Sequence, residues 1–234
     1  MARYLELAAA VTVGAVAAIL LCAWLLVGHG DADAADRASA RKEGYSQGWG
    51  DAQASLSEPR DDAGYMPLYL QTDPQWADEG YSDGTIGTYG CGLTACAMAT
   101  TYLTGDRVTP GYLADRVGES CLTDRVNDMG KFSKWMVQTY RSTSTPVEAG
   151  ETQWALADAL PFLDRGYVLM AGLSGRLGER SYGGHIVLIW GKTEDGEYLV
   201  RDPASGKNSE HLFALEELKR ADWGAFRPVR AKEV

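Results

Sequence analysis

Residues 89–103, with the sequence YGCGLTACAMATTYL, decide how the fold of this chain is interpreted. The segment is rich in alanine and other small or apolar residues, which predicts a helix buried in the core of a domain. Gly105 follows two residues later, near the position expected of a helix C-cap. The first helix of the domain is therefore predicted to begin at about Cys91.

Helical patterns precede strand patterns in the rest of the domain. Helices are predicted at residues 109–117, 129–140 and 151–165, the first opened by Thr109-Pro110 and the last ended by Gly166. Short apolar or aromatic segments predict strands at residues 66–71, 167–173, 185–190, 198–201 and 223–229. Residues 73–88, rich in Gly, Asp, Ser and Tyr, predict a long ordered loop. This order of elements predicts an α+β fold.

The N-terminal residues have the composition of a membrane anchor. Residues 7–28, LAAAVTVGAVAAILLCAWLLVG, carry no charge, and a helix of this length can cross a bilayer core of about 30 Å. The alternative is a cleavable signal peptide, for which Ala32-Asp33-Ala34 offers a small-residue cleavage site.

The rest of the chain divides into a stalk and a folded domain. We expect residues 1–30 to be the anchor, residues 31–62 to be a flexible stalk rich in Ala, Ser, Gly and charge, and residues 63–234 to be the domain. A short tail before the span and a large domain after it favour export of the domain. The expected location is therefore the cell membrane, with a single span and the domain outside the cytoplasm.

Composition argues against nucleic acid and metal as partners. The formal net charge is −10 and no basic stripe is present that could follow a phosphate backbone. The chain has 4 cysteines and 3 histidines, without the closely spaced pairs typical of structural zinc sites. We expect neither a metal nor another cofactor.

Cys91 has the surroundings of a reactive thiol. In the first turn of a helix it lies among backbone N–H groups without intrahelical acceptors and near the positive end of the helix dipole, and both favour the thiolate. Gly90 and Gly92 are expected to let a substrate approach the backbone closely and to permit a tight turn into the helix. The alternative is a small apolar residue that only packs at a helix start.

His185 is the candidate base. It follows Tyr182-Gly183-Gly184 and opens an apolar segment, which places it at a strand end beside a flexible loop. His29 lies at the edge of the predicted membrane span, and His211 lies in a polar stretch typical of a solvated surface.

Asp202 can orient this histidine in one of two possible hairpin registers. A four-residue loop at residues 192–195 places Asp202 directly opposite His185. A two-residue turn at Asp195-Gly196 instead places Asp202 opposite Ile189, about 13 Å from His185 at about 3.3 Å per residue. Asp202 also precedes Pro203 and can simply end a strand.

Three blocks of sequence carry a resemblance to a known family. Tyr89-Gly90-Cys91-Gly92-Leu93-Thr94, Gly183-Gly184-His185-Ile186-Val187 and Val200-Arg201-Asp202-Pro203 resemble papain-like peptidase domains related to the bacteriocin-processing, double-glycine leader peptidases. The resemblance implies a papain-like fold with Cys91 as nucleophile, His185 as base and Asp202 as the residue that orients the base. Leu93 departs from it, because proline is common at that position.

The same resemblance implies a glutamine that donates a hydrogen bond to the oxyanion. Gln71 matches that position and Gln75 is the alternative. The sequence thus predicts a thiol peptidase that cleaves a peptide or amide bond in a peptide or protein through an acyl-enzyme on Cys91. Acyl transfer on the same fold and a non-catalytic peptide-binding module are the alternatives.

Cys96 and Cys121 are expected to be core residues, with a disulfide between them as the alternative.

Overall fold

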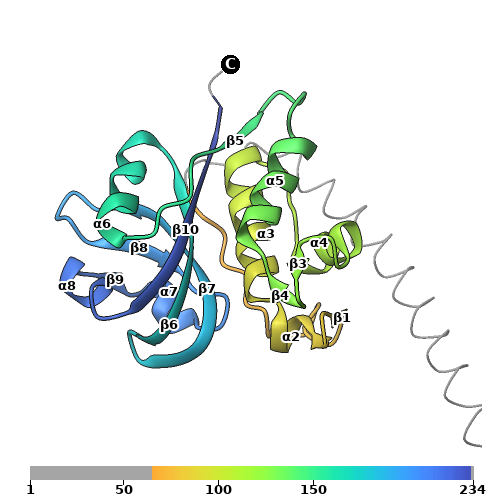
Figure 1. Cartoon of the computed structure of the whole chain (residues 1–234), viewed down its shortest axis with the longest axis horizontal. Helices are drawn as coiled ribbons and strands as arrows, with labels where there is room; N and C mark the ends of the chain where they lie inside the picture. Colours follow the sequence, from red (N-terminus) through yellow and green to blue (C-terminus); the bar gives the residue numbers. More distant parts are fainter. Residues whose placement is uncertain (1–64, 233–234) are drawn as a thin grey trace, which may run out of the picture. The chain divides into compact units, whose positions relative to one another are not determined.

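The structure is a computed structural model that describes residues 65–232. Within this range the first part of the chain is mostly helical and the second part forms a sheet, and the two lie side by side (Figure 1). The mixed helix and antiparallel-sheet architecture follows the expected order. The predicted anchor and stalk, residues 1–62, lie outside the described residues. Among the residues that are described, no helix has the length and hydropathy needed to span a bilayer.

The helical part has three main helices and two short hairpins. It consists of β1 (Gly80–Tyr81), β2 (Gly84–Thr85), α2 (Ile86–Tyr89), α3 (Cys91–Thr104), α4 (Pro110–Val117), β3 (Leu122–Thr123), β4 (Val126–Asn127) and α5 (Met129–Thr139). The helix predicted from the opening stretch is confirmed as α3: it begins at Cys91 and ends at Gly105, whose φ of 77° is the left-handed conformation of a glycine C-cap.

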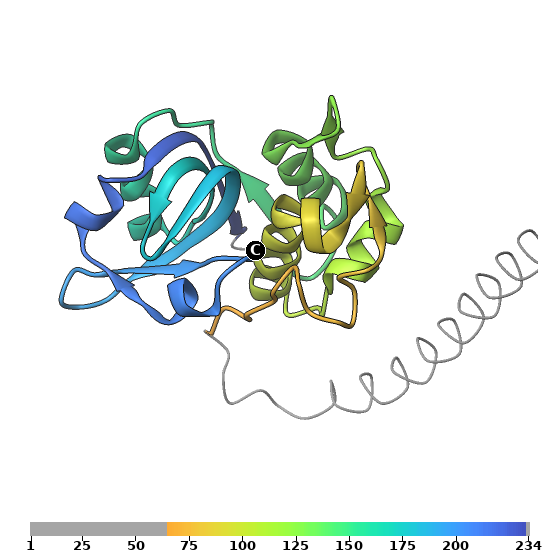
Figure 2. The ribbon, with the colours of Figure 1, turned by 90° about the horizontal axis from the view of Figure 1, so that it is seen from below.

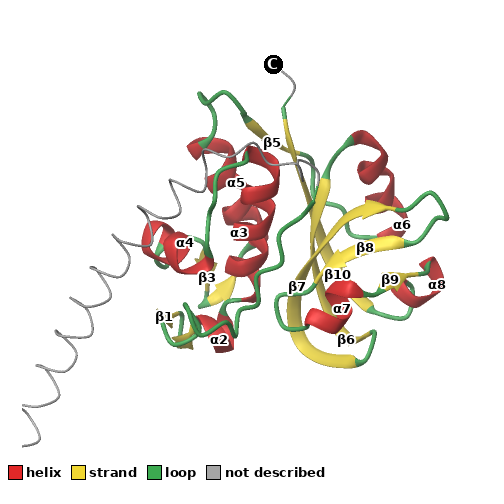
Figure 3. Cartoon of the chain, turned by 180° about the vertical axis from the view of Figure 1, so that it is seen from behind, coloured by secondary structure: helices red, strands yellow, loops and turns green. Residues whose placement is uncertain are grey.

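The second part of the chain is a six-stranded antiparallel sheet flanked by short helices. Its elements are β5 (Val147–Ala149), α6 (Leu156–Ala159), η1 (Leu160–Arg165), β6 (Val168–Leu177), β7 (Arg180–Lys192), β8 (Tyr198–Arg201), α7 (Gly206–Glu210), β9 (Leu212–Phe213), α8 (Leu215–Leu218) and β10 (Asp222–Ala231). The strand order is β5-β10-β6-β7-β8-β9, so the long strands β10, β6 and β7 are neighbours inside the sheet and the short strands β5 and β9 form its edges (Figure 3).

The core lies on both faces of this sheet because strand residues alternate between them. Met170, Ile186 and Leu188 face the helical part and pack in one cluster with Leu93 and Met98 of α3. The opposite face packs against the short helices of the second part and includes Leu169, Val187, Ile189, Phe213, Leu218 and Phe226. Almost the whole surface of α3 is buried between helices and sheet, which explains its small side chains (Figure 2).

Three predicted elements differ from the structure. The loop predicted at residues 73–88 contains β1, β2 and the start of α2, so α2 and not α3 is the first helix of the described residues. Residues 66–71 form no strand: Met66 is fully buried, but the backbone of Tyr69 donates to Met98 Sδ (3.2 Å) and that of Gln71 to Pro203 O (2.8 Å). The helix predicted at 151–165 begins only at Leu156.

The reason for the late start of that helix is a backbone pairing. Gln153 and Phe226 exchange N–H···O bonds of 3.0 and 2.8 Å where β10 has a register shift between Trp223 and Phe226. The irregular strand presents unpaired backbone groups there, and a neighbouring segment satisfies them in preference to forming a helical turn.

Candidate active site

Cys91 is half-buried at the start of α3, with Gly90 as the N-cap. The glycines on either side of it are required by packing. A side-chain carbon at Gly90 would lie 2.5 Å from Ile86 O, and one at Gly92 would lie 2.6 Å from Asn127 Cβ and 2.9 Å from Ile186 Cδ1. From the sequence, these glycines are expected to allow substrate approach and a tight turn. The contacts show in addition that they let α2 and β4 close around the cysteine.

Asn127 is a polar neighbour of the thiol that sequence reasoning missed. Its Nδ2 donates to Tyr89 O (2.7 Å) and lies 3.7 Å from Cys91 Sγ, and its Oδ1 accepts from the Tyr81 hydroxyl (2.9 Å). These bonds fix the amide so that an N–H group faces the sulfur. Such a donor favours the charged form of a thiol.

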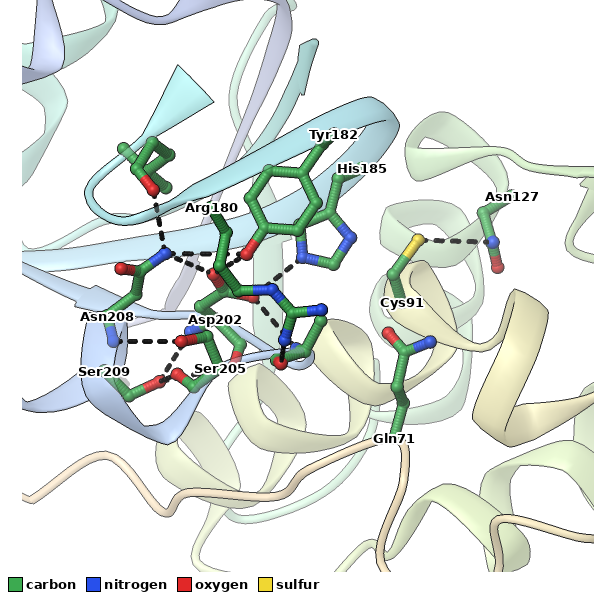
Figure 4. Close-up of polar contacts among 12 residues, drawn as sticks. Gln71, Cys91, Asn127, Arg180, Tyr182, His185, Asp202, Ser205, Asn208 and Ser209 are labelled. Carbon is green, nitrogen blue, oxygen red and sulfur yellow. Dashed lines mark hydrogen bonds and ion pairs between the residues drawn. The ribbon is translucent and has the colours of Figure 1, made fainter. Parts of the chain in front are cut away.

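His185 and Asp202 meet as a hydrogen-bonded pair. His185 Nε2 lies 2.8 Å from Asp202 Oδ1, and both side chains are buried, to 5% and 0% exposed. Because Nε2 is engaged by the carboxylate, Nδ1 is the ring nitrogen left for Cys91, which lies across from the imidazole in Figure 4. The structure thus brings together Cys91, His185 and Asp202, with the imidazole of His185 between the thiol and the carboxylate.

Both predicted hairpin registers are nevertheless wrong. Leu188 pairs with Arg201 and Lys192 pairs with Tyr198, with a register shift between Ile189 and Gly191 and a five-residue loop at 193–197. This register places Asp202 midway between the two predicted positions, one step beyond the end of β8. Asp202 reaches His185 from there as a diagonal neighbour, a separation that side chains can bridge.

The strand-end position predicted for His185 is also wrong. Tyr182, Gly183 and Gly184 belong to β7, whose pairing with β6 shifts register between Leu173 and Gly175. The Tyr182 ring stacks on the imidazole, with centroids 4.2 Å apart and an interplanar angle of 8°. The segment therefore forms an ordered side wall for His185.

The Asp202 carboxylate accepts four hydrogen bonds. Besides His185, its carboxylate accepts from the Tyr182 hydroxyl (2.5 Å), Asn208 Nδ2 (2.9 Å) and the Ala204 backbone (2.9 Å), while its own N–H donates to Ser209 Oγ (2.8 Å). Burial would raise the pKa of Asp202, but the hydrogen bond and charge of His185 and the bonds from Tyr182 and Asn208 outweigh burial and lower this pKa. The carboxylate therefore stays ionised beside the histidine.

The pKa of His185 is displaced in the opposite direction. Burial lowers it, but the hydrogen bonds to Asp202 and Cys91 and the negative charges of both residues outweigh burial and raise the pKa to about 9. At neutral pH the imidazole is therefore protonated and can act as a proton donor.

The two candidate glutamines lie in different environments. Gln71 is buried, its Nε2 donates to Gly87 O (2.9 Å), and its Oε1 accepts no hydrogen bond from residues 65–232. In Figure 4 its amide points toward Cys91. Gln75 is exposed, and its backbone N–H bonds to Asp73 Oδ1 (2.9 Å). Position therefore favours Gln71, and the role of its amide stays a prediction.

The remaining cysteines and histidines lie apart from this site. Cys96 and Cys121 are buried free thiols, so the expectation of core residues fits the structure better than a disulfide. His211 is half-exposed and bonds to Glu217 (3.1 Å), while His29 lies outside the described residues. Within residues 65–232 no cluster of three or more potential metal ligands occurs.

Comparison with known families agrees with this geometry. Residues 65–230 match the family described as "Peptidase_C39 like family". The chain belongs to this family. The match covers the helical part and the sheet, and therefore all four candidate residues. A comparison with curated proteins gave no match. Membership of this peptidase family, together with the Cys91, His185 and Asp202 geometry, is typical of a cysteine peptidase and of a peptide or protein substrate.

Selective alkylation tests whether Cys91 is the reactive thiol. Brief iodoacetamide treatment followed by peptide mapping is expected to modify Cys91 well before Cys96 or Cys121. Burial raises the pKa of both other thiols, so they stay protonated and inaccessible, whereas Cys91 is half-buried beside an imidazolium. Faster modification of Cys96 or Cys121 would contradict the assignment of the nucleophile.

Proposed function

We propose that the protein is a thiol peptidase that cleaves a peptide or amide bond through an acyl-enzyme on Cys91. The observation that carries this proposal is the buried His185–Asp202 pair facing a cysteine in the first turn of α3. Burying charged groups costs free energy even when they are paired. A module that only binds peptides gains nothing from a buried carboxylate that holds an imidazole against a thiol.

The reaction follows from the positions of these groups. The Cys91 thiolate attacks the carbonyl carbon, and the oxyanion that forms accepts hydrogen bonds from first-turn N–H groups of α3 and from Gln71. As the intermediate collapses, the C–N bond breaks and the His185 imidazolium gives its proton to the leaving amine. Neutral His185 then removes a proton from water, which attacks the thioester and releases the acid and the thiolate.

Cleavage of peptides by the purified full-length protein tests this function. Wild type is expected to generate new amino termini from a peptide library, identified by mass spectrometry, and Cys91→Ala is expected to generate none. Addition of hydroxylamine or a peptide amine separates hydrolysis from acyl transfer, because a ligated product forms only if the thioester is captured by the amine. Equal cleavage by wild type and Cys91→Ala would contradict the proposal.

Gln71 is expected to stabilise the oxyanion. Gln71→Ala should lower turnover by about 10²- to 10³-fold, roughly 2.7 to 4 kcal/mol, since the donor acts only on charge present in the transition state. The rate of Cys91 alkylation and the melting temperature should change little. Gln75→Ala is the matched control and should be mild, because Gln75 is exposed. A severe effect of Gln75→Ala with a mild effect of Gln71→Ala would reassign the donor.

Activity is expected to fall as the pH rises through about 9. A raised pKa means that His185 keeps its proton up to that pH, and above it the leaving amine loses its proton donor. Stability is expected to fall with pH in the same direction. The raised pKa of His185 stabilises the folded state fully below pH 6.5, the ordinary pKa of histidine, and this stabilisation is lost between pH 6.5 and about 9. The measurement is kcat/KM against pH; an alkaline limb near 7 would contradict the assigned pairing.

We also propose that residues 7–28 anchor the protein in the cell membrane, with the peptidase domain outside the cytoplasm. The support is the uncharged 22-residue segment in the sequence. Extraction of membranes with carbonate should leave the full chain in the membrane fraction, and protease added outside intact cells should remove the domain. Release of a shortened chain into the medium would instead indicate a cleaved signal.

A further inference from the structure

A cavity of about 420 Å³ lies between the helical part and the sheet. Its walls come from β4 and the start of α5 on one side and from β10 and residues 152–154 on the other. Asn127 belongs to this lining, and its Nδ2 lies 3.7 Å from Cys91 Sγ. A peptide bond held at the sulfur therefore places neighbouring substrate side chains within reach of the cavity.

Arg227 lines the cavity, and its positively charged side chain forms no ion pair with any of residues 65–232. In β10 it pairs with Met170, a residue of the core that faces the helical part, so Arg227 projects from the sheet toward α5. Its Nε is buried without a hydrogen-bond acceptor, and among residues 65–232 no carboxylate lies within ion-pair distance of the guanidinium. The N–H groups of Nη1 and Nη2 thus remain as donors for a ligand in the cavity.

The protein leaves room for this guanidinium. A side-chain carbon at Gly130 would lie 3.0 Å from Arg227 Nη2. Asp128, a carboxylate that also lines the cavity, has other hydrogen-bond partners: it accepts from Thr123 Oγ1 (2.7 Å) and, as the N-cap of α5, from the backbone of Lys131 (3.0 Å). Asp128 therefore accepts hydrogen bonds from Thr123 and from the start of α5, and it does not accept one from Arg227.

The rest of the lining is mainly apolar. Met129 and Ala225 line the cavity beside Arg227, and Trp154 and Val126 line it while 75% and 67% exposed. A side chain with an apolar stem and an acceptor at its tip fits such walls, because the stem covers apolar surface while the tip meets the arginine. A carboxylate matches a guanidinium best, since the two planar groups form paired hydrogen bonds.

We propose that this cavity is a specificity pocket for an acidic side chain, glutamate in particular, close to the bond that Cys91 attacks. The inference rests on the proposed peptidase function. Since an extended chain advances about 3.3 Å per residue, the recognised side chain lies within about three residues of the cleaved bond. Arg227 is then a specificity residue that does not touch the reacting atoms.

The test is cleavage of a library of peptides blocked at both ends by the full-length protein in detergent, with cleavage sites read by mass spectrometry. Wild type is expected to show enrichment of glutamate at one fixed position. Matched peptides with glutamate or glutamine there should differ about 10- to 100-fold in kcat/KM, the range expected for a hydrogen-bonded charge. Arg227→Gln should reduce this ratio to about 1, and Arg227→Glu should shift the preference to lysine or arginine.

Arg176→Gln is the matched control, because it removes the same charge at an exposed position of β6 outside the cavity lining and should keep the preference for glutamate. Alkylation of Cys91 at the wild-type rate in Arg227→Gln shows that the site is intact. Cleavage by wild type without acidic enrichment, or enrichment that persists in Arg227→Gln, would overturn the pocket and leave the peptidase function standing. Absence of any cleavage by wild type would overturn both.

Discussion

Replacing Asp202 with asparagine is expected to lower kcat by about 10⁴-fold, the size of effect seen when a catalytic histidine loses its orienting carboxylate. The imidazolium that donates its proton to the leaving group is stabilised by the charge of Asp202 at 2.8 Å. An amide carries no charge and can present N–H to the ring, which favours the wrong tautomer. The measurement is kcat on any peptide that the wild type cleaves, with alkylation of Cys91 as a second readout.

The same substitution should also destabilise the domain. The Asp202 carboxylate is fully buried and accepts from Tyr182, Asn208 and Ala204 as well as His185. In the asparagine variant an NH₂ group replaces one carboxylate oxygen, so the groups that donated to that oxygen lose their acceptor. Each group left unsatisfied lowers the free energy of unfolding by about 1–3 kcal/mol. Asp195→Asn is the control, because this residue is exposed in the β7–β8 loop and should keep wild-type kcat and melting temperature. Equal rates for Asp202→Asn and Asp195→Asn would contradict the orienting role.

Replacing Cys91 with alanine is expected to lower turnover by about 10⁶-fold, since removal of a nucleophile leaves only the binding and oxyanion contributions. The fold should survive, because the side chain is half-buried and alanine suits a helix. The pKa of His185, followed by NMR, should fall, because Cys91 supplies part of what raises it. Cys96→Ala, a buried change in the same helix, should keep turnover while lowering stability. Loss of turnover in Cys96→Ala alone would contradict the account.

Local signals were enough to predict the helix that carries Cys91. A run of small and apolar residues, a glycine before the cysteine and a glycine C-cap lie within 16 residues of one another, and no distant part of the chain is needed to interpret them. The same holds for β8, whose bounds at Tyr198 and Arg201 match the prediction. The start predicted for helix 151–165 was wrong because Gln153 bonds to β10, and a local sequence pattern does not indicate such a partner.

The site could be predicted only in part for the same reason. Asp202 was a candidate through one of two possible hairpin registers and through the family resemblance, yet its position depends on a register shift between Ile189 and Gly191 that no local rule specified. Asn127 and Arg227 gave no signal at all, because their significance comes from Cys91 and from a cavity built by segments about 100 residues apart in the chain. A residue that acts through tertiary contact is identified only once the fold is known.

The central claim is that Cys91 forms an acyl-enzyme, and trapping that species tests it most directly. Full-length protein mixed with a peptide that it cleaves, quenched in acid within one turnover, is analysed by intact-mass and peptide mass spectrometry. We expect an added mass equal to the acyl half of the peptide, located on Cys91, that disappears as product accumulates. Product formed at the wild-type rate with no adduct on Cys91, or an adduct located on another residue, would contradict the account.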